Sequence, residues 1–418
     1  MDLLRIQGGV PIRGETRVYG AKNAALPILA ATVMAAGTSV IEDVPNLEDV
    51  RVMMQILEQL GARVRWYSTT SVEVDASSIH STNVPADLMQ RMRSSIFLMG
   101  PLLARFGDVT LSKPGGCVIG QRPIDYHLHG MRQLGAKIEE RHGYIRCSAR
   151  RLVGTSITLD FPSVGATENL MMAAALADGV TVIENAAREP EVEDLAQFLM
   201  ASGAAIDGAG SDTVVIHGCS HLHDTTYQII PDRIVTGTLL LAAAATRGEV
   251  TVLGARLNHL GAIVQKLRDT GVRVDVDRDI ITVKCDETPQ AVDFRTAPFP
   301  GFPTDLQAPF MALLTTSSGT SVIHESVFEA RFKHVDELKR MGADIAVDMR
   351  TAVVRGVPTL SGARVTASDL RGGAALLVAA LMADGTTEVD GVKHIDRGYQ
   401  SIEEHLAMLG ARSERVSL

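Results

Sequence analysis

Residues 24–44, AALPILAATVMAAGTSVIEDV, decide the fold of this chain. They begin with a stretch rich in Ala, Leu and Met, which favour a helix. This stretch is apolar nearly all round, so we expect a buried helix. Gly37 can end that helix in a left-handed conformation, and the β-branched residues after it are typical of a strand. Residues 56–66, ILEQLGARVRW, then contain a second glycine, Gly61, and another strand.

The segment between these two stretches predicts an amphipathic surface helix. Apolar side chains recur there at helical spacing, on one face, at Val52, Ile56, Leu57 and Leu60. Polar side chains take the opposite face at Arg51, Gln55 and Glu58. One module therefore holds a buried helix, a strand, a surface helix and a further strand.

The same module recurs six times along the chain. Its second glycine recurs every 68 to 74 residues, at Gly61, Gly135, Gly203, Gly271, Gly342 and Gly410. Its first glycine lies about two dozen residues upstream, at Gly37, Gly107, Gly179, Gly248, Gly319 and Gly385. We interpret these glycines as helix caps, because no GxxxxGK[ST] or GxGxxG phosphate-binding pattern is present.

Six modules could form one large barrel or two domains of three. Pro231 and Asp232 lie near the middle break and favour two domains. The fold class is therefore α/β, with strands and helices alternating in every module.

Composition narrows the function classes. The net charge of −9 argues against a general nucleic-acid or anionic-membrane binder, although local cations can still bind a small anion. Neither a signal peptide nor an apolar run of roughly 18 residues is evident, and no membrane association is expected. The scattered cysteines contain no CxxC pair and predict reduced thiols in the cytoplasm. His127, His129 and His394 lack a matching cluster, so we expect neither a metal nor a cofactor.

Residues that break the repeated frame are the candidates for chemistry. Lys22 and Asn23 stand at the mouth of the first buried helix, where they could hold an anion, or serve only as a solvated lysine and an N-cap. Cys117 lies in a Gly-rich loop between Lys113 and Arg122, and nearby cations make a thiol a better acid or nucleophile. The other cysteines, Cys147, Cys219 and Cys285, are interpreted as structural.

Further candidates open the modules of the second half. Asp305 could cap the fifth buried helix or accept a proton from a substrate hydroxyl. Arg331, Arg371 and Arg397 are suited to bidentate binding of phosphate or carboxylate. If the helix starts converge, these arginines, Lys22 and Arg122 would surround a small dianion such as a phosphorylated carboxylate.

These motifs together resemble the enolpyruvyl transferase family, and in particular its UDP-N-acetylglucosamine enzymes of peptidoglycan synthesis. The resemblance runs from about residue 2 to about residue 415. Its strings include GAKNAALPILAA, PGGCVIGQRPID, PSVGATEN, NAAREPEVEDL, FPTDLQAPF, VFEARF, ASDLR and HIDRGY. It implies a two-domain inside-out α/β barrel. Residues 22–229 would form one domain, residues 1–21 with 230–418 the other, and the active site would lie in the cleft between them.

The resemblance also implies the reaction. Such enzymes transfer the enolpyruvyl group of phosphoenolpyruvate to the 3-hydroxyl of UDP-N-acetylglucosamine by addition and elimination, and release phosphate. By motif match Cys117 is the proton donor and Asp305 the base. Lys22, Arg122 and Arg397 would hold the phosphate, with Asn23 beside them, and Arg331 and Arg371 would lie near the carboxylate. The matched sugar-nucleotide contacts are Asn23, Arg93, Arg122, Pro123, Ile124, Asp125, Tyr126, Ser163, Val164, Gly165, Asp305 and Val327.

The resemblance carries further implications and some departures. The family's cysteine is the target of the epoxide fosfomycin, so Cys117 implies sensitivity. The chain departs from common family residues at Glu48, Phe161 and Val235. A transferase acting on shikimate 3-phosphate is the nearest rival, but it lacks a PGGC loop. A silent sugar-nucleotide sensor is the rival from another class, and the presence of Lys22, Cys117, Asp305 and Arg397 argues against it.

Overall fold

The computed structural model describes residues 2–115 and 124–417, which form two units. We call residues 20–115 and 124–230 the Lys22 unit, and residues 2–19 with 231–417 the Asp305 unit. Gly20, Ala21 and Ile230 thus lie just outside the predicted range 22–229 but inside the Lys22 unit. The Ala21 N–H donates to the Ile230 carbonyl at 2.7 Å, which holds these residues to one another.

The Lys22 unit contains three sheets. Their strand orders are β13-β3-β5-β4, β6-β8-β7 and β11-β12-β10-β9. The strands are β3 Thr38–Glu42, β4 Arg63–Trp66, β5 Val72–Asp75, β6 Asp108–Ser112, β7 Lys137–Arg141, β8 Tyr144–Ser148, β9 Ser156–Thr158, β10 Val180–Glu184, β11 Ala205–Asp207, β12 Thr213–His217 and β13 Thr226–Gln228. The helices are α1 Lys22–Ala31, η1 Thr32–Met34, α2 Glu48–Gln59, α3 Ala86–Arg91, η2 Arg93–Leu98, α4 Met99–Phe106, α5 Asp125–Gln133, α6 Val164–Ala175 and α7 Pro190–Ala201.

The Asp305 unit also contains three sheets, ordered β21-β22-β1-β23, β15-β16-β14-β2 and β17-β18-β20-β19. The strands are β1 Asp2–Gln7, β2 Arg13–Arg17, β14 Glu249–Leu253, β15 Arg273–Asp277, β16 Ile280–Lys284, β17 Phe294–Arg295, β18 Thr320–His324, β19 Asp344–Asp348, β20 Thr351–Arg355, β21 Arg364–Thr366, β22 Thr386–Asp390 and β23 Arg412–Ser417. The helices are α8 Arg233–Ala245, η3 Leu257–His259, α9 Gly261–Asp269, η4 Thr304–Leu306, α10 Gln307–Leu314, α11 Val335–Arg340, α12 Leu370–Met382, α13 Val392–Ile395 and α14 Ile402–Met408.

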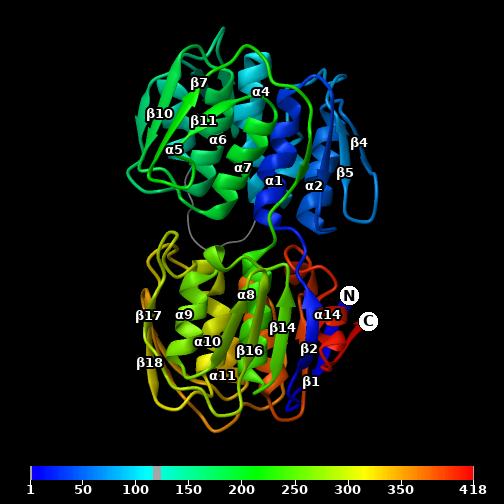
Figure 1. The fold of residues 1–418 in the computed structure, drawn as a ribbon, viewed down its shortest axis with the longest axis vertical. Coiled ribbons are helices and arrows are strands. Elements are labelled where there is room, and N and C mark those ends of the chain that lie inside the picture. Colours follow the sequence, from blue (N-terminus) through cyan, green and yellow to red (C-terminus); the bar gives the residue numbers. More distant parts are fainter. Residues whose placement is uncertain (1, 116–123, 418) are drawn as a thin grey trace. The chain divides into compact units, whose positions relative to one another are not determined.

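Each unit keeps its apolar helices inside and its sheets outside. All eight residues of α10 are buried, and α8, α10 and α12 pack against one another. Figure 1 shows strands on the outer sides, for example β4 and β5 in the Lys22 unit and β17 and β18 in the Asp305 unit. This arrangement confirms the α/β fold class and the inside-out arrangement of three repeats per unit. No helix within the described ranges has both the length and the apolarity to cross a bilayer.

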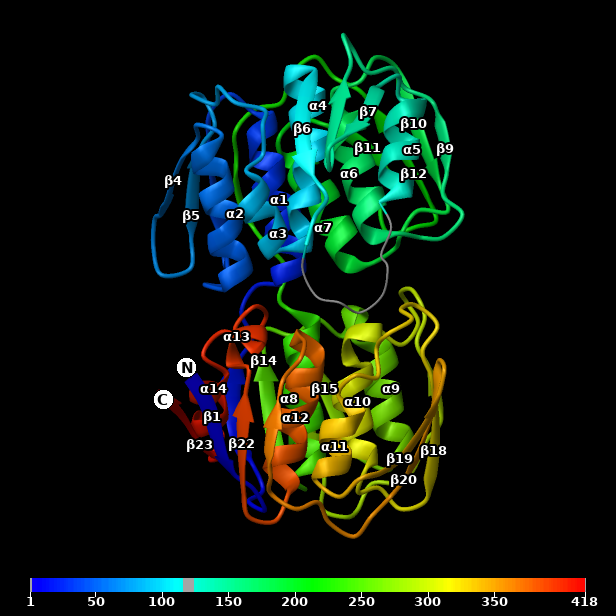
Figure 2. The same cartoon turned by 180° about the vertical axis from the view of Figure 1, so that it is seen from behind.

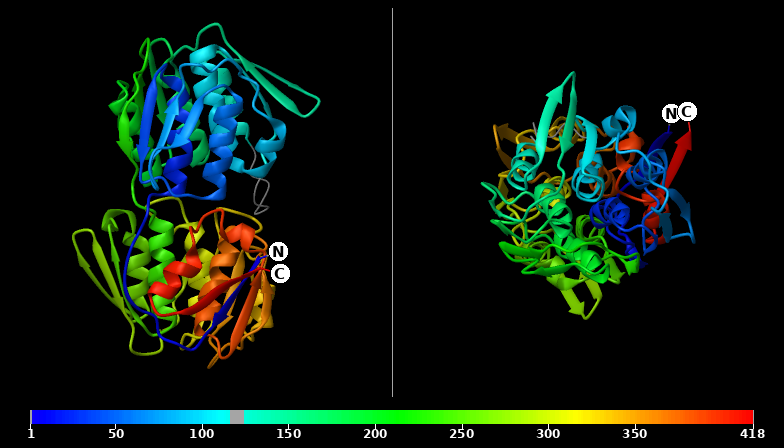
Figure 3. Two further views of the ribbon diagram at one scale, coloured as in Figure 1. Left: turned by 90° about the vertical axis from the view of Figure 1, so that its right-hand side faces the viewer. Right: turned by 90° about the horizontal axis from the view of Figure 1, so that it is seen from above.

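The first strand of the chain completes the last repeat. β1 pairs antiparallel with β22 and with β23, through Leu4↔Val389 and Leu4↔Arg415. Figures 2 and 3 show the two chain ends beside each other at this sheet. In the sheet of the last module, β1 from the N-terminus therefore lies between β22 and β23. In the other modules, the strand in this position comes from the module itself.

The surface helix of the first module also follows its prediction. Val52, Ile56 and Leu57 of α2 and the following Leu60 are buried, whereas Arg51, Gln55 and Glu58 are exposed.

The repeated glycines serve two structural purposes. The six second glycines all have a positive φ, between 85° and 105°. Among the first glycines, Gly37 and Gly248 do not have one. A Cβ at Gly248 would lie 2.0 Å from the carbonyl oxygen of Ile12, so this glycine is required by a close backbone approach.

Substituting one glycine of each kind in the fourth repeat separates the two purposes. Gly271, at φ +85°, has open space around its missing side chain, and we expect Gly271→Ala to cost about 1–2 kcal/mol because of the left-handed backbone alone. Gly248→Ala forces the backbone at Ile12 to move, and we expect a loss above about 4 kcal/mol. Urea unfolding followed by circular dichroism measures both losses. Equal losses would contradict the close-approach interpretation.

Candidate functional site

In the Lys22 unit, the first candidate lysine starts a buried helix. Lys22 is the first residue of α1, and the N-cap is Ala21, which makes no side-chain cap hydrogen bond. The suggestion that Asn23 caps this helix is therefore wrong, because Asn23 is already its second residue. The Lys22 Nζ donates to Asp49 Oδ2 at 3.1 Å, and both side chains are buried. Asp49 lies in the first turn of α2, where a negative charge is favourable.

A second cluster of the Lys22 unit joins several residues matched to the sugar nucleotide. Arg93 begins η2, Ser163 caps α6 by accepting from the Ala166 N–H, and Gly165 follows in the first turn. His127 of α5 lies close to Gly165 and within the electrostatic influence of Arg93. A Cβ at Gly165 would contact His127, and burial together with the charge of Arg93 lowers the pKa of His127 to about 3. The His127 ring therefore stays neutral at pH 7.

The start of α5 belongs to the same region. Ile124 is its N-cap residue, and Asp125 and Tyr126 form its first turn. Burial, followed by the charges of Asp125 and Asp160, raises the pKa of Tyr126. The sequence pattern offered His127 only as a possible metal ligand, and its position beside Gly165 could not be predicted from it. No group of three or more His, Cys, Asp or Glu side chains in the described ranges is arranged to hold a metal.

The Lys22 unit also contains a buried acid that the sequence did not single out. Glu168 of α6 is fully buried, and neither of its carboxyl oxygens has a hydrogen-bond partner within the described structure. Burial, followed by the charges of Glu191 and Glu189, raises its pKa well above the ordinary value. Its surroundings therefore favour the protonated, neutral form of Glu168 over the carboxylate.

The Asp305 unit brings three predicted residues into direct contact. Asp305 Oδ1 accepts from Arg331 Nη2 at 2.5 Å, and Asp305 Oδ2 accepts from Arg371 Nη2 at 2.8 Å. The Arg331 and Arg371 side chains are only 4% and 6% exposed, whereas the Asp305 side chain is 26% exposed. The carboxylate thus bridges two buried guanidinium groups and is the most exposed of the three side chains.

Asp305 does not cap the fifth buried helix. It lies in the short helix η4, and α10 begins two residues later without a side-chain cap. The cap interpretation is therefore wrong, and the carboxylate is instead held by two arginines. They are distant in sequence, and no local pattern could have identified the pairing.

Buried groups fix this cluster from behind. Glu325, fully buried, accepts from Thr304 Oγ1 at 3.0 Å and from the Val327 N–H at 2.8 Å, so it ties η4 to the turn that carries Val327. Asp369 caps α12 by accepting from the backbone N–H of Arg371 at 3.0 Å. The Arg371 guanidinium lies 5.7 Å from the ring centre of Tyr399. Burial is the largest single effect and lowers the pKa of Arg371, but the charges of Asp305, Tyr399 and Asp232 and the hydrogen bond to Asp305 together outweigh it, so the net direction is upward.

The remaining predicted residues are less well defined. Arg397 lies half-buried in the turn after α13. Cys117, Arg122 and Pro123 lie outside the described residues. The described cysteines are free thiols, and burial raises the pKa of each, to about 12 for Cys147. They are not the activated thiols that sequence reasoning sought at Cys117.

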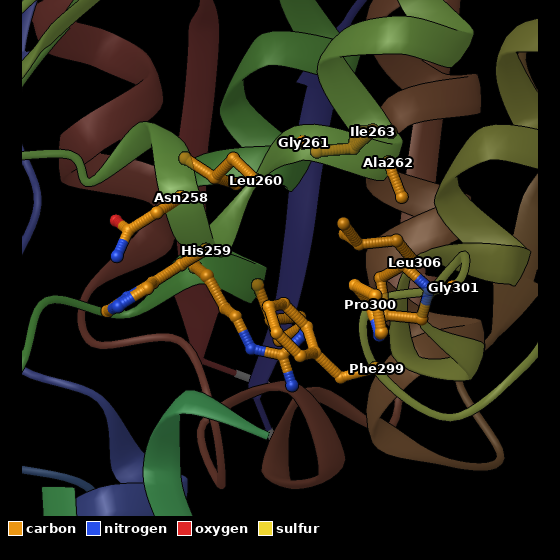
Figure 4. Close-up of a pocket in the computed structure, with 13 residues that line it drawn as sticks. Asn258, His259, Leu260, Gly261, Ala262, Ile263, Phe299, Pro300, Gly301 and Leu306 are labelled. Carbon is orange, nitrogen blue, oxygen red and sulfur yellow. The ribbon is translucent and has the colours of Figure 1, made fainter. Parts of the chain in front are cut away.

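A pocket of about 50 Å³ borders the Asp305 cluster. Pro303 and Leu306, which flank Asp305, form part of its wall, together with residues 258–263 and 299–301 (Figure 4). Arg233, at the start of α8, lies over the Phe299 ring at 5.7 Å. The volume of this pocket admits water-sized molecules and is too small for a nucleotide.

His334 lies beside this cluster, only 2% exposed, and neither ring nitrogen has a hydrogen-bond partner in the described part of the chain. Burial, opposed by Asp369 and assisted by Arg331, lowers its pKa from 6.5 to about 4. The unfolded chain takes up this proton near pH 6.5 and the folded chain only near pH 4. Stability should therefore fall as the pH drops through that range, by roughly 3 kcal/mol for this group.

The variant His334→Phe should flatten this acid limb, because the ring can no longer titrate. The measurement is the free energy of unfolding in urea between pH 7.5 and 4. The control His217→Phe replaces an exposed histidine and should retain the wild-type slope. An unchanged slope in His334→Phe would mean that the pKa of His334 is the same in the folded and the unfolded chain, and would contradict the lowered pKa.

Comparisons with known proteins place this geometry in a family. Residues 6–406 match the family described as EPSP synthase (3-phosphoshikimate 1-carboxyvinyltransferase). UDP-N-acetylglucosamine 1-carboxyvinyltransferase 2 of Caldanaerobacter subterraneus is 53% identical over 417 residues, covering 100% of each chain. The enzyme named UDP-N-acetylglucosamine 1-carboxyvinyltransferase of Desulfosudis oleivorans is 49% identical, again with 100% of each chain covered.

Solved structures agree on the fold. The enolpyruvyl transferase NikO from Streptomyces tendae superposes with a TM-score of 0.91 at 29% identity, covering 100% of this chain and 99% of that one. An EPSP synthase from Acinetobacter baumannii, at 17% identity and full coverage of both chains, reaches 0.77 and supports the fold alone. On this evidence the chain belongs to the EPSP synthase family of enolpyruvyl transferases, within its branch of UDP-N-acetylglucosamine 1-carboxyvinyltransferases.

Proposed function

We propose that this protein transfers the enolpyruvyl group of phosphoenolpyruvate to the 3-hydroxyl of UDP-N-acetylglucosamine and releases phosphate. This would be the first committed step of peptidoglycan synthesis. The observation that carries the proposal is the full-length identity of about half to relatives of that name. The Asp305 cluster supports it. Two buried guanidinium groups suit an anionic substrate such as phosphoenolpyruvate, and the partly exposed carboxylate beside them suits a base for the sugar hydroxyl.

The chemistry assigns a role to each candidate. In the addition step, Asp305 accepts the proton of the sugar hydroxyl, whose oxygen bonds to C2 of phosphoenolpyruvate while Cys117 protonates C3. In the elimination step, C3 returns a proton to the Cys117 thiolate, the double bond re-forms, and the bond from C2 to the phosphate oxygen breaks. Phosphate leaves with the electron pair of that bond. No net oxidation occurs, and no cofactor is required.

We assign the substrate contacts as the motifs suggest. Lys22, Asn23, Arg122 and Arg397 would bind the phosphate end, and Arg331 and Arg371 the carboxylate. The sugar nucleotide would contact Arg93, residues 122–126, residues 163–165 and Val327. The cluster around His127 supports part of this set, because Arg93 and Gly165 both lie close to that ring.

A cytoplasmic location agrees with the free thiols of the described cysteines. Neither a metal nor a nucleic-acid partner enters the proposal.

Release of inorganic phosphate tests the reaction. Purified protein with phosphoenolpyruvate should release phosphate when UDP-N-acetylglucosamine is added, and not when shikimate 3-phosphate is added instead. Mass spectrometry should find the sugar nucleotide heavier by one enolpyruvyl group. Turnover with shikimate 3-phosphate alone would refute the acceptor assigned here.

The acid is tested by Cys117→Ser. Loss of a general acid costs about 10²–10⁴-fold in rate, and we expect a fall of that size in phosphate release. An epoxide phosphonate such as fosfomycin should add one covalent mass to the wild type and none to the variant. The matched control is Cys219→Ser, at a half-buried thiol whose Sγ donates to the Ala175 carbonyl at 3.2 Å. Labelling of Cys117→Ser, or its full turnover, would exclude Cys117 as the acid.

A further inference from the structure

The Asp305 carboxylate occupies both guanidinium groups that are expected to hold the carboxylate of phosphoenolpyruvate. Each of its oxygens accepts from a different arginine, at 2.5 Å and 2.8 Å. A carboxylate that bridges two guanidinium groups is the arrangement that an incoming substrate carboxylate would itself adopt. Both arginine side chains are almost fully buried, whereas the Asp305 side chain that pairs with them is 26% exposed.

The same contacts make Asp305 a poor base in this state. Each carboxylate oxygen already accepts a short, charge-assisted hydrogen bond from an arginine, and these bonds stabilise the ionised form that a base must give up when it takes a proton. Two adjacent cations also favour the ionised carboxylate over the protonated one. Asp305 must leave at least one arginine before it can take a proton effectively.

We propose that the Asp305 carboxylate is an internal stand-in for the carboxylate of phosphoenolpyruvate, and that substrate binding displaces it and thereby releases the base. This inference rests on the proposed function and adds a regulation of the same site. Base and substrate compete for the same two arginines. Asp305 therefore becomes free to deprotonate the sugar hydroxyl only when phosphoenolpyruvate is present to react.

The surroundings allow this exchange without a change of fold. Thr304, next to Asp305, is fixed by Glu325 and by its own carbonyl, which accepts from Arg331 Nη2 at 3.2 Å. Arg371 is fixed through the cap that Asp369 makes on α12. The moving part is thus the Asp305 side chain, which is the most exposed member of the cluster. One carboxylate replaces another, so the buried guanidinium groups stay paired throughout.

Binding of phosphoenolpyruvate alone to Asp305→Asn tests the exchange. Removal of the internal competitor should tighten binding by about tenfold, within the 5–150-fold range typical of coupled equilibria. Isothermal titration calorimetry on the full chain gives the Kd. Inorganic phosphate, which lacks a carboxylate, should bind the variant and the wild type equally. The control Asp344→Asn removes the same charge from an exposed ion pair of the same unit and should leave the Kd unchanged.

The outcomes separate this inference from the proposed function. Asp305→Asn should lose turnover by about 10²–10⁴-fold because it lacks the base. If turnover is lost but phosphoenolpyruvate binds equally or more weakly, the stand-in role is wrong and the catalytic role remains. If the wild type releases no phosphate with UDP-N-acetylglucosamine, the proposed function itself fails. Circular dichroism checks folding, and Asp305→Ser provides a second variant with the same expected tightening.

Discussion

Two buried guanidinium groups that share one carboxylate form the constraint on which the Asp305 unit depends. Taking an arginine out of water is costly, and a buried ion whose partner is removed destabilises a protein by roughly 3–5 kcal/mol. Arg331 and Arg371 are buried because they lie beside apolar helices, and Asp305 is what makes this burial tolerable. The cluster is therefore part of the folded structure as well as a candidate binding site.

The repeated fold supplies the positions for such a cluster. The buried helices are largely apolar, and several of the candidate charged residues lie at or just before a helix start. Lys22 begins α1, Arg371 lies in the first turn of α12, and Asp305 lies two residues before the start of α10. Because α10 and α12 pack against each other, residues at their starts come within hydrogen-bond distance although they lie far apart in sequence. The architecture thus places the candidate residues Lys22, Asp305 and Arg371 at or near helix starts, whereas most of each buried helix consists of apolar side chains that pack in the core.

Local patterns predicted the frame of this fold well. The second glycines have the left-handed backbone that a helix cap requires, and α2 buries the face that its periodicity indicated. Both features depend on neighbours within a few residues. Gly248 was misinterpreted as a cap, because its true constraint is the Ile12 carbonyl, which is more than two hundred residues distant.

The contacts of the candidate site could be predicted only in part for the same reason. Residue type and position singled out Lys22, Asp305, Arg331 and Arg371, but their partners did not follow from the sequence. Asp49 as the partner of Lys22 and Glu325 as the clamp on Thr304 depend on which helix starts meet in space. Among the departures from the family pattern, Val235 is buried in α8 and Glu48 forms an exposed ion pair with Arg91.

The chain as a whole is negatively charged, whereas its candidate site contains two arginines and one aspartate. Charges act over a limited distance in salt solution, so the net charge of the chain does not prevent the site from binding an anion. A net charge of −9 would repel a dianion if it acted as one distant field. At physiological salt, however, exposed charges are screened beyond about 8 Å, whereas buried pairs are screened much less. Arg331 and Arg371 are buried and held in place, so under the proposed exchange they would dominate the field at short range when a ligand takes the place of Asp305. An acidic protein can therefore bind an anion when its cations are buried, paired with its own carboxylates at rest, and exposed to a ligand only by exchange.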